Sequence, residues 1–212
     1  MKNLSTDSSS MWVTVQSDAK ILGMSSRLQS HMRFGQWHDI EVEDDVTNYM
    51  EYENGATGVF VTSTWDAHGT NRLEVQMDRA RMIVENDRLS LLEYEMSEPE
   101  WSQTNTVPYA TMPAREVEVK TDGQNPQHVG VLNAWAGAIL RGEPLVASGE
   151  EGINGLMLSN AMHLSAFLGQ LVELPIDEDL YYDELMKRVT NSRRKIGNQS
   201  VFADTRGSYS GV

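Results

Sequence analysis

The sequence predicts an α+β fold with an open, mainly antiparallel β-sheet and helices packed on one of its faces. Three observations support this class. Apolar and polar residues alternate with a period of two over much of residues 27–119, which is typical of half-buried strands. After Gly123 the apolar residues recur at helical spacing instead. The outer faces of the expected strands are polar, which indicates an antiparallel sheet that is covered on one side only.

The first expected elements are a strand and a hairpin. Residues 28–34 alternate along the whole stretch. Two longer alternating stretches, Val46–Glu53 and Ala56–Thr64, flank Asn54-Gly55. An Asn-Gly pair suits a type I′ turn, because both central positions of that turn need a positive φ. We therefore expect a hairpin that turns at Asn54-Gly55.

The same signals, alternation and turn residues, extend the sheet further along the chain. The pattern is interrupted in one stretch, which contains three prolines, Pro99, Pro108 and Pro113. The elements expected here are a strand over residues 73–77, a hairpin of residues 81–85 and 89–94 across Asn86-Asp87, a long excursion over residues 96–113, and a short strand at Val117 and Val119.

Three helices are expected after residue 123, and each has its own start signal. The first follows Asn125 as a cap, has Pro126 at its first position, and stops at Gly142. The second follows a capping box at Ser148–Glu151, and the third follows Asp177. The apolar stripes expected in these helices are Leu132, Trp135, Ala136, Ile139 and Leu140; Ile153, Leu156, Met157, Leu164 and Phe167; and Leu180, Tyr181, Leu185 and Val189.

The chain divides into three expected segments. Residues 1–24 form an N-terminal segment that we expect to be partly disordered, because residues 1–10 are rich in Ser and Asp; residues 11–24 fit either a strand or a short helix. Residues 25–192 form one α+β domain. Residues 193–212 are rich in Gly and Ser after a basic start, and we expect a flexible tail there.

Charge and composition exclude several classes of function. The net charge of −14 and the pI near 4.7 disfavour nucleic acid and anionic membrane surfaces as partners. The absence of cysteine excludes disulfides, thiolate metal sites and a cysteine nucleophile. The sequence has neither an apolar run long enough to span a bilayer nor a recognisable secretory signal, so we expect a soluble, cytoplasmic protein.

The glycines and histidines of the chain do not have the spacing of a cofactor or metal motif. No two glycines lie two residues apart, so the chain has no G-x-G-x-x-G fingerprint and we expect no cofactor-binding residues in it. Gly149, Gly152 and Gly155 are best interpreted as close helix packing. The five histidines lack metal-ligand spacing, which disfavours a stand-alone metalloenzyme. His128 lies in a first helical turn, where it is either a ligand contact or simply exposed, and His163 is most simply a packed or surface residue.

The most promising segment for ligand contact runs from residue 62 to residue 72. It follows a strand end and carries an aromatic ring, a carboxylate, an imidazole, an amide and a guanidinium. These groups suit a sugar-sized ligand, although a purely structural turn fits about as well. The acidic run of residues 41–45 likewise fits either a solvated loop or carboxylates that bind a polyol or a cation. The candidate residues in the segment are Trp65, Asp66, His68, Asn71 and Arg72.

Several stretches, taken together and in order, resemble the C-terminal domain of Gfo/Idh/MocA-type oxidoreductases. The resemblance covers roughly residues 25–190. It implies a preceding Rossmann domain that binds NAD or NADP, and an α+β domain whose open sheet contacts substrate and mediates oligomerisation. Sugars, inositols and related polyols are the substrates it implies. The stretches are Trp37–Thr47, Glu53–Phe60, Gly69–Glu74, Gly142–Leu145, Gly149–Gly152 and Leu174–Asp177.

The chain departs from this family in its catalytic groups. The Glu-Lys-Pro motif that would supply a lysine is missing, and no histidine has an aspartate four residues before or three residues after it. We therefore expect no catalytic residue and no metal in this chain, and NAD or NADP only in a complete enzyme. Whether the chain is an enzyme by itself stays open, and we expect it to be inactive alone.

Two hypotheses of function follow. In the first, the chain is the substrate-binding and oligomerisation domain of a truncated NAD(P)-dependent sugar or polyol oxidoreductase, with Trp65, Asp66, His68, Asn71, Arg72 and His128 at the substrate and a homodimer or higher homo-oligomer formed through the sheet. In the second, it is a non-catalytic binding or assembly module that dimerises through its open sheet face. The expected dimer contacts are Met50, Tyr52, Val59 and Val61.

Overall fold

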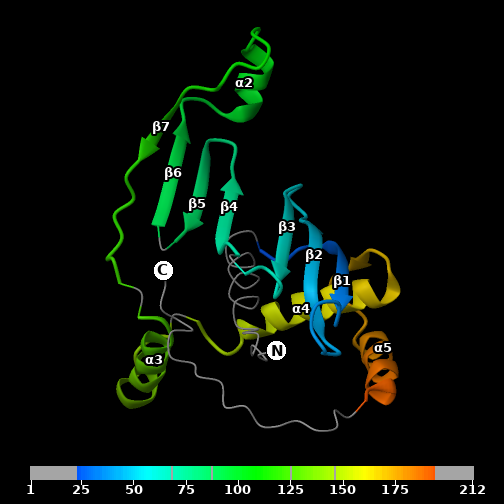
Figure 1. The fold of residues 1–212 in the computed structure, drawn as a ribbon. Coiled ribbons are helices and arrows are strands. Elements are labelled where there is room, and N and C mark those ends of the chain that lie inside the picture. Colours follow the sequence, from blue (N-terminus) through cyan, green and yellow to red (C-terminus); the bar gives the residue numbers. More distant parts are fainter. Residues whose placement is uncertain (1–22, 68, 87, 125, 146, 194–212) are drawn as a thin grey trace. The chain divides into compact units, whose positions relative to one another are not determined.

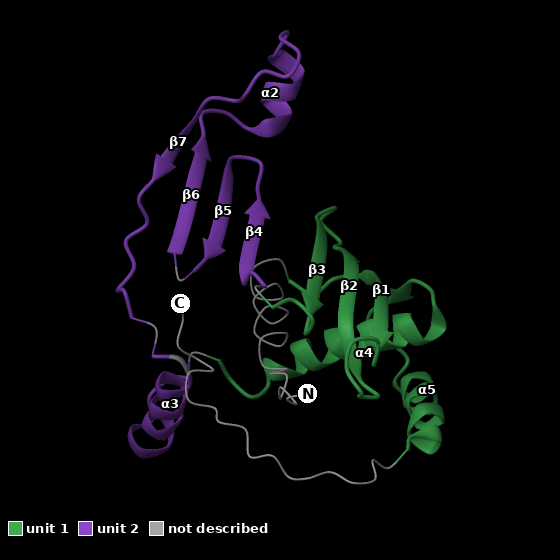
Figure 2. Cartoon of the chain, viewed as in Figure 1, with its two compact units in different colours: residues 1–68, 147–209 green, residues 69–146, 210–212 purple. Residues whose placement is uncertain are grey.

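The computed structural model describes residues 23–193, apart from residues 68, 87, 125 and 146. The expectations for residues 1–22 and 194–212 therefore lie outside the described residues. The chain forms two compact units: residues 1–68 with 147–209, and residues 69–146 with 210–212 (Figure 2). We call them the first and second units and describe each by itself.

The first unit contains a four-stranded antiparallel sheet in the order β3-β2-β1-β8. Figure 1 shows β3, β2 and β1 side by side. The expected strand forms β1, and Leu28 is paired with Met50 on β2 and with Val172 on β8. The edge strand β8 has only two residues, which is too short for alternation to reveal it. The strands are β1 (Arg27–Phe34), β2 (Glu43–Glu51), β3 (Thr57–Ser63) and β8 (Val172–Glu173).

The β2–β3 hairpin is present, but its turn differs from the expected type. Gly55 has a φ of 83°, whereas Asn54 is not among the residues with positive φ. Gly55 N–H donates to the carbonyl of Tyr52 at 3.0 Å, and Tyr52 N–H donates to the carbonyl of Ala56 at 3.0 Å. This is a three-residue loop with a left-handed glycine at its end. The Asn54 side chain accepts a hydrogen bond from Ala56 N–H at 3.0 Å, and thereby stabilises the turn from its negative-φ position.

Helix α4 (Gly152–Leu168) packs against one face of this sheet and forms the core (Figure 1). The expected stripe is partly wrong. Leu164 is buried, but Ile153 and Leu156 are exposed, and the buried face runs through Leu158 and Met162 instead. The added Cβ atoms at Gly149, Gly152 and Gly155 would meet no described atom within 4 Å, so the described residues do not show the close packing expected of these glycines. The buried apolar residues of this core are Leu28, Val46, Met50, Tyr52, Phe60, Leu158, Ala161, Met162, Leu164 and Val172.

Helix α5 (Glu178–Asn191) begins where the sequence predicts it. The Asp177 carboxylate accepts a hydrogen bond from Leu180 N–H at 3.0 Å, which caps the helix, and Glu178 and Asp179 favour its first turn electrostatically. Ser148 Oγ accepts a hydrogen bond from Glu151 N–H at 3.4 Å, as a capping box requires. Helix α4 itself begins at Gly152, directly after this box.

The second unit contains a separate antiparallel sheet in the order β4-β5-β6-β7. The expected hairpin is confirmed: Glu85 pairs with Arg88 across a two-residue connection, and Asn86 has a φ of 52°. One face of this sheet is apolar and carries Val75 and Met82, whereas the other is charged. The strands are β4 (Arg72–Gln76), β5 (Ala80–Glu85), β6 (Arg88–Tyr94) and β7 (Ala114–Val117).

Two helices belong to the second unit. The expected irregular excursion contains helix α2 (Glu98–Thr104), which Ser97 caps and which Pro99 favours from its first turn. Helix α3 (Gln127–Arg141) ends at Gly142, whose φ of 69° provides the left-handed stop that the sequence predicts. The expected apolar stripe of α3 is exposed among the described residues, at Leu132, Trp135, Ile139 and Leu140.

The α+β class and the antiparallel pairing are confirmed, with two four-stranded sheets in place of one. Within the described residues, no helix is long and apolar enough to cross a membrane.

Candidate functional site

The strand ends of the first sheet bring together two tryptophans and several polar groups. The connection between β1 and β2 carries Trp37 and His38. Asp44 is the second residue of β2, and Thr64 and Trp65 follow β3. Because β2 pairs with both neighbours, these ends meet at one edge of the sheet. We call these five residues the tryptophan edge.

The indole rings of Trp37 and Trp65 stack on each other. Their centroids lie 4.6 Å apart and their planes differ by 20°. The residues remain 39% and 57% exposed, respectively, so part of each indole surface is open to solvent. Exposed, mutually supported aromatic rings offer a flat apolar surface whose geometry is already fixed.

Asp44 holds the connection that carries Trp37. Its Oδ2 accepts hydrogen bonds from the backbone N–H groups of Trp37 at 2.7 Å and His38 at 3.1 Å, and the residue is only 1% exposed. Burial alone raises the pKa of Asp44, but the backbone N–H groups of this connection outweigh burial and hold the pKa below its usual value. Asp44 is therefore a buried, ionised anchor, and neither of the two interpretations of the acidic run describes it.

His38 and Thr64 give the edge a polar rim. The Thr64 hydroxyl lies 3.2 Å from Nδ1 of His38, and Asp44 Oδ2 lies 3.7 Å from the same nitrogen. A relay that activates a nucleophile needs the hydroxyl and the carboxylate on opposite ring nitrogens. Because both groups approach Nδ1, this trio suits hydrogen bonding to a ligand and not nucleophilic catalysis.

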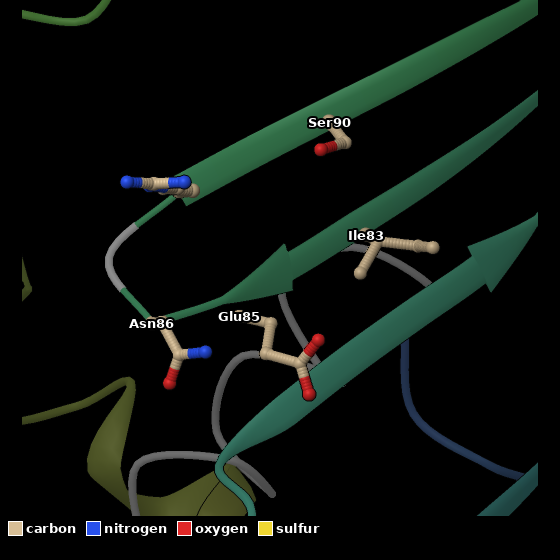
Figure 3. Close-up of a pocket in the computed structure, with 5 residues that line it drawn as sticks. Ile83, Glu85, Asn86 and Ser90 are labelled. Carbon is tan, nitrogen blue, oxygen red and sulfur yellow. The ribbon is translucent and has the colours of Figure 1, made fainter.

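A second polar region lies on the charged face of the other sheet, within the second unit. Arg72 forms ion pairs with Glu74 at 2.6 Å and with Glu85 at 3.0 Å. The hydrogen bond with Glu74 raises the pKa of Arg72 and lowers that of Glu74. Glu85 also lines a hollow of about 680 Å³ at the β5–β6 turn, together with Asn86 and Ser90 (Figure 3). Hydroxyl-rich ligands match such a set of amide, hydroxyl and carboxylate groups.

The residues predicted from the sequence fall in both units. Trp65 and Asp66 belong to the first unit, whereas Asn71, Arg72 and His128 belong to the second. Asp66 and Asn71 are exposed, and His128 is exposed in the first turn of α3. His68 lies outside the described residues.

Sequence reasoning missed Trp37 and His38 as partners of Trp65 and Thr64. They are 26 to 28 positions apart, and only the register of β1, β2 and β3 makes them neighbours. The available signal was the position of both segments at ends of neighbouring predicted strands.

The sequence also missed a pairing of Glu43 with His163. His163 Nε2 lies 3.1 Å from a Glu43 carboxylate oxygen, and Nδ1 donates to the Ser159 carbonyl at 2.8 Å. Burial lowers the pKa of His163, but the hydrogen bonds to Glu43 and Ser159 outweigh it and raise the pKa above its usual value. Among the described residues, no group of three or more His, Asp or Glu side chains could hold a metal ion.

Comparison with known proteins assigns the chain to a family. A family model described as the C-terminal alpha/beta domain of an oxidoreductase family, Gfo/Idh/MocA, matches residues 19–174. No curated protein matches the chain.

Solved structures of oxidoreductases share the fold. The WlbA dehydrogenase from Bordetella pertussis, solved with NADH and UDP-GlcNAcA, is 18% identical, with a TM-score of 0.57 over 79% of this chain and 44% of its own. The WlbA dehydrogenase from Chromobacterium violaceum, with the same ligands, is 23% identical, with a TM-score of 0.56 over 77% of this chain and 44% of its own. The aldose-aldose oxidoreductase from Caulobacter crescentus, complexed with glycerol, is 16% identical, with a TM-score of 0.57 over 77% of this chain and 45% of its own.

The chain thus spans less than half of the length of each of these three proteins. The family match extends over most of the chain, from the segment before β1 to the end of β8. The protein belongs to the Gfo/Idh/MocA oxidoreductase family, and residues 19–174 form its C-terminal α/β domain.

Proposed function

We propose that this chain is the substrate-binding domain of an NAD(P)-dependent oxidoreductase that acts on a sugar, an inositol or a related polyol. In the complete enzyme, a hydride would pass between nicotinamide and a secondary alcohol carbon of the substrate. The contribution of this chain is to bind and orient that substrate. A cytoplasmic location stays a prediction, which cell fractionation tests.

The tryptophan edge is the observation that carries this proposal. An indole face suits the apolar C–H face of a sugar ring, and the rim of His38 and Thr64 suits its hydroxyl groups. The structural neighbours were solved with UDP-GlcNAcA and with glycerol, which supports a hydroxyl-rich ligand. Asp66, Asn71, Arg72, His68 and His128 remain proposed substrate contacts.

Tryptophan fluorescence tests the proposed substrate contact. We expect glucose, myo-inositol or glycerol to cause a saturable change in emission, because a ring placed on Trp65 alters the surroundings of its indole. Trp65→Ala should weaken the apparent affinity by about tenfold, because it removes the indole face on which the ligand would lie. Trp135→Ala is the matched control, because Trp135 is 58% exposed on α3 and Trp65 is 57% exposed. The absence of any saturable change, or an equal loss in Trp135→Ala, contradicts the proposal.

The residues of this chain do not fit a dinucleotide. The pyrophosphate of NAD binds at a glycine-rich turn before a helix, and no pair of glycines in this chain has the required spacing. We therefore expect the 212-residue chain to show no micromolar binding of NADH or NADPH by calorimetry and no turnover. Micromolar binding of either dinucleotide would contradict this expectation.

A second candidate function is assembly through the uncovered face of the first sheet. The exposed residues Val59 and Val61 lie on this face, opposite α4, and the paired residues Tyr49 and Thr47 lie beside them. Exposed β-branched and aromatic side chains on a flat sheet suit a two-fold interface. The sequence-based contacts Met50 and Tyr52 are wrong, because both side chains are buried in the core.

Sedimentation velocity at micromolar concentration tests the assembly. We expect a dimer or a higher oligomer for the wild-type chain and a monomer for Val59→Asp/Val61→Asp. Asn154→Asp, at an exposed position of α4 on the other side of this sheet, serves as the charge control. A wild-type monomer would argue against assembly through this face.

A further inference from the structure

Strand β3 leaves one long edge of the first sheet unpaired. In the order β3-β2-β1-β8, β3 is an end strand, and within the described residues no other strand pairs with its far side. Helix α4 packs chiefly against β1, two strands away from this edge. Unpaired edges are ready templates for another strand, so proteins usually protect them. We call this side of β3 the β3 edge.

The β3 edge lacks the usual protection. Natural edge strands are kept apart by charged side chains, by proline or by very short length. The other three edge strands of the described chain follow this rule, because β4 and β7 each carry an arginine and a glutamate, and β8 has only two residues, one of them a glutamate. Strand β3 has seven residues, Thr57–Ser63, with no charge and no proline. In a chain of net charge −14, an uncharged edge is also where two copies repel each other least.

The hydrogen bonds between β2 and β3 determine which backbone groups of β3 face outward. Tyr52 N–H donates to the Ala56 carbonyl, and Thr64 N–H donates to the Asp44 carbonyl, each at 3.0 Å. Hydrogen-bonded pairs alternate along an antiparallel ladder, so the even-numbered residues of β3 direct their backbone groups toward β2. The odd-numbered residues direct their N–H and C=O groups to the β3 edge. These outward residues are Thr57, Val59, Val61 and Ser63.

We propose that a second copy of this chain pairs with the β3 edge, strand β3 against strand β3, in antiparallel register about a two-fold axis at Phe60. Residue 57 then lies opposite residue 63 of the second copy, and residue 59 lies opposite residue 61 of the second copy. All outward residues are paired in this register, and each pair exchanges two hydrogen bonds. A shift of the axis by two residues in either direction leaves some of these groups beyond the end of the opposite strand.

The sequence of β3 identifies the second copy as the partner. It is nearly symmetrical about Phe60, with a valine on either side at positions 59 and 61 and a hydroxyl residue at each end. Antiparallel pairing of two identical strands places this sequence against itself, so each valine meets a valine of the second copy. Val59 and Val61 are 67% and 63% exposed on the uncovered face, whereas Phe60 is 4% exposed and stays in the core on the opposite face.

Edge pairing differs from the face-to-face assembly proposed above and does not rest on it. It extends the sheet sideways through backbone groups and places the Cα atoms of a hydrogen-bonded pair about 5.5 Å apart. Face-to-face packing instead places the two sheets about 10 Å apart. A disulfide needs Cα atoms within about 7 Å of each other, so it can form between opposite residues in the first arrangement and not in the second.

Disulfide formation between two variants tests the register. The protein has no cysteine, so Thr57→Cys and Ser63→Cys each carry a single thiol. We expect an oxidised equimolar mixture to give at least fivefold more linked dimer than either variant alone, because residue 57 lies opposite residue 63 and about 20 Å from residue 57 of the second copy. Thr47→Cys mixed with Ser63→Cys is the control, since Thr47 is exposed on the same face of β2 but away from the edge.

The yields of linked dimer decide between the arrangements. Equal yields from the Thr57→Cys/Ser63→Cys mixture and from the separate variants, or from this mixture and the control mixture, overturn the proposal. A wild-type dimer whose variants form no such disulfide would support face-to-face assembly and likewise overturn edge pairing.

Sedimentation of a proline variant tests the backbone hydrogen bonds. Val61→Pro removes an outward N–H group and no hydrogen bond to β2, so the sheet itself is retained, which far-UV circular dichroism checks. We expect Val61→Pro to raise the dissociation constant of the dimer about tenfold or more, and Val61→Thr, which keeps the N–H group, to change it less than about threefold. A wild-type chain that stays monomeric at micromolar concentration, or equal effects of the two variants, overturns the proposal.

Discussion

Asp44 shows how one buried carboxylate positions a loop through hydrogen bonds from backbone N–H groups. Its hydrogen bonds go to the backbone N–H groups of Trp37 and His38, and the stacking of Trp37 on Trp65 depends on that loop. The sequence marks Asp44 only as one acid in an acidic run, because no local pattern records which backbone groups a carboxylate will meet. The candidate role of Trp65 was predictable, because the residue follows an expected strand. The role of Trp37 was not, because only the register of the paired strands brings Trp37 next to Trp65.

Asp44→Asn should destabilise the protein. The substitution replaces a charged acceptor by a neutral one at buried N–H groups, which costs about 2 kcal/mol in free energy of unfolding. Because its folded pKa is depressed, the contribution of Asp44 is present above its ordinary value of 3.8 and is lost as the pH falls through the folded pKa. Urea denaturation at pH 7 measures the loss. Asp45→Asn, at the adjacent and less buried position, should change stability by less than about 0.5 kcal/mol, and equal effects of the two variants would refute the anchoring role.

The Glu43–His163 pair makes stability depend on pH. Burial opposes the charged form of each group, but hydrogen bonding between the two raises the pKa of His163 and lowers that of Glu43. The histidine contribution is fully present below its ordinary pKa of 6.5 and is lost as the pH rises through the raised folded pKa. The glutamate contribution is present above 4.5 and is lost as the pH falls through the lowered folded pKa.

His163→Gln should therefore cost the most between about pH 4.5 and pH 6.5, by roughly 1 kcal/mol, and progressively less in alkaline solution. Urea titrations of the wild type and the variant across this range measure the difference. His31→Gln, at an exposed position of β1, is the control. A difference that does not change with pH would show that the pair contributes only through packing.

At the scale of elements, the sequence predicts which strands and helices exist better than it predicts which face of each one is buried. Both hairpins, the start of α5 and the end of α3 follow from short-range signals at Asn54-Gly55, Asn86, Asp177 and Gly142. The face of α4 does not, because its apolar residues occur around much of the helix and only the packing partner selects Leu158 over Leu156. The type of turn at Gly55 and the formation of helix α2 depend on which local hydrogen bonds form. Residue preferences alone do not tell which of the alternative hydrogen bonds is the stronger.

Leu158→Ala and Leu156→Ala separate the two faces of α4. Leu158 is 1% exposed and Leu156 is 50% exposed. We expect Leu158→Ala to lower the free energy of unfolding by about 2–5 kcal/mol because it leaves a cavity in the core. Leu156→Ala, the same chemical change two residues away, should cost less than about 1 kcal/mol. Chemical denaturation of both variants checks the difference, and similar losses would place Leu156 in the core after all.

The whole molecule consists of two units with unequal cores. Of the described apolar residues that are buried, ten lie in the first unit and one, Val75, lies in the second. Apolar burial is the dominant favourable term in folding, so the first unit holds most of the stability that the described residues provide. Sequence periodicity could not reveal this imbalance, because β4, β5 and β6 have the same alternation as the strands of the first unit.

We therefore expect the backbone amides of β4–β7 to exchange with solvent faster than those of β1–β3. Local opening costs less where fewer apolar contacts must be broken. Hydrogen–deuterium exchange followed by mass spectrometry measures both sheets in one experiment on the full chain. Equal protection of the two sheets would show that the second unit is stabilised as strongly as the first.

The two cores also set how oxidants act on this protein. The chain contains 12 methionines and no cysteine, so its sulfur chemistry is confined to thioethers. Met77, which follows β4, is 42% exposed, whereas Met50 and Met162 are 2% and 1% exposed between β2 and α4. Met77 is therefore open to oxidation in the folded protein, where a sulfoxide would place a polar oxygen next to β4, while Met50 and Met162 react only when the first unit opens. Oxidation of Met50 and Met162 is thus a chemical record that the first unit has opened.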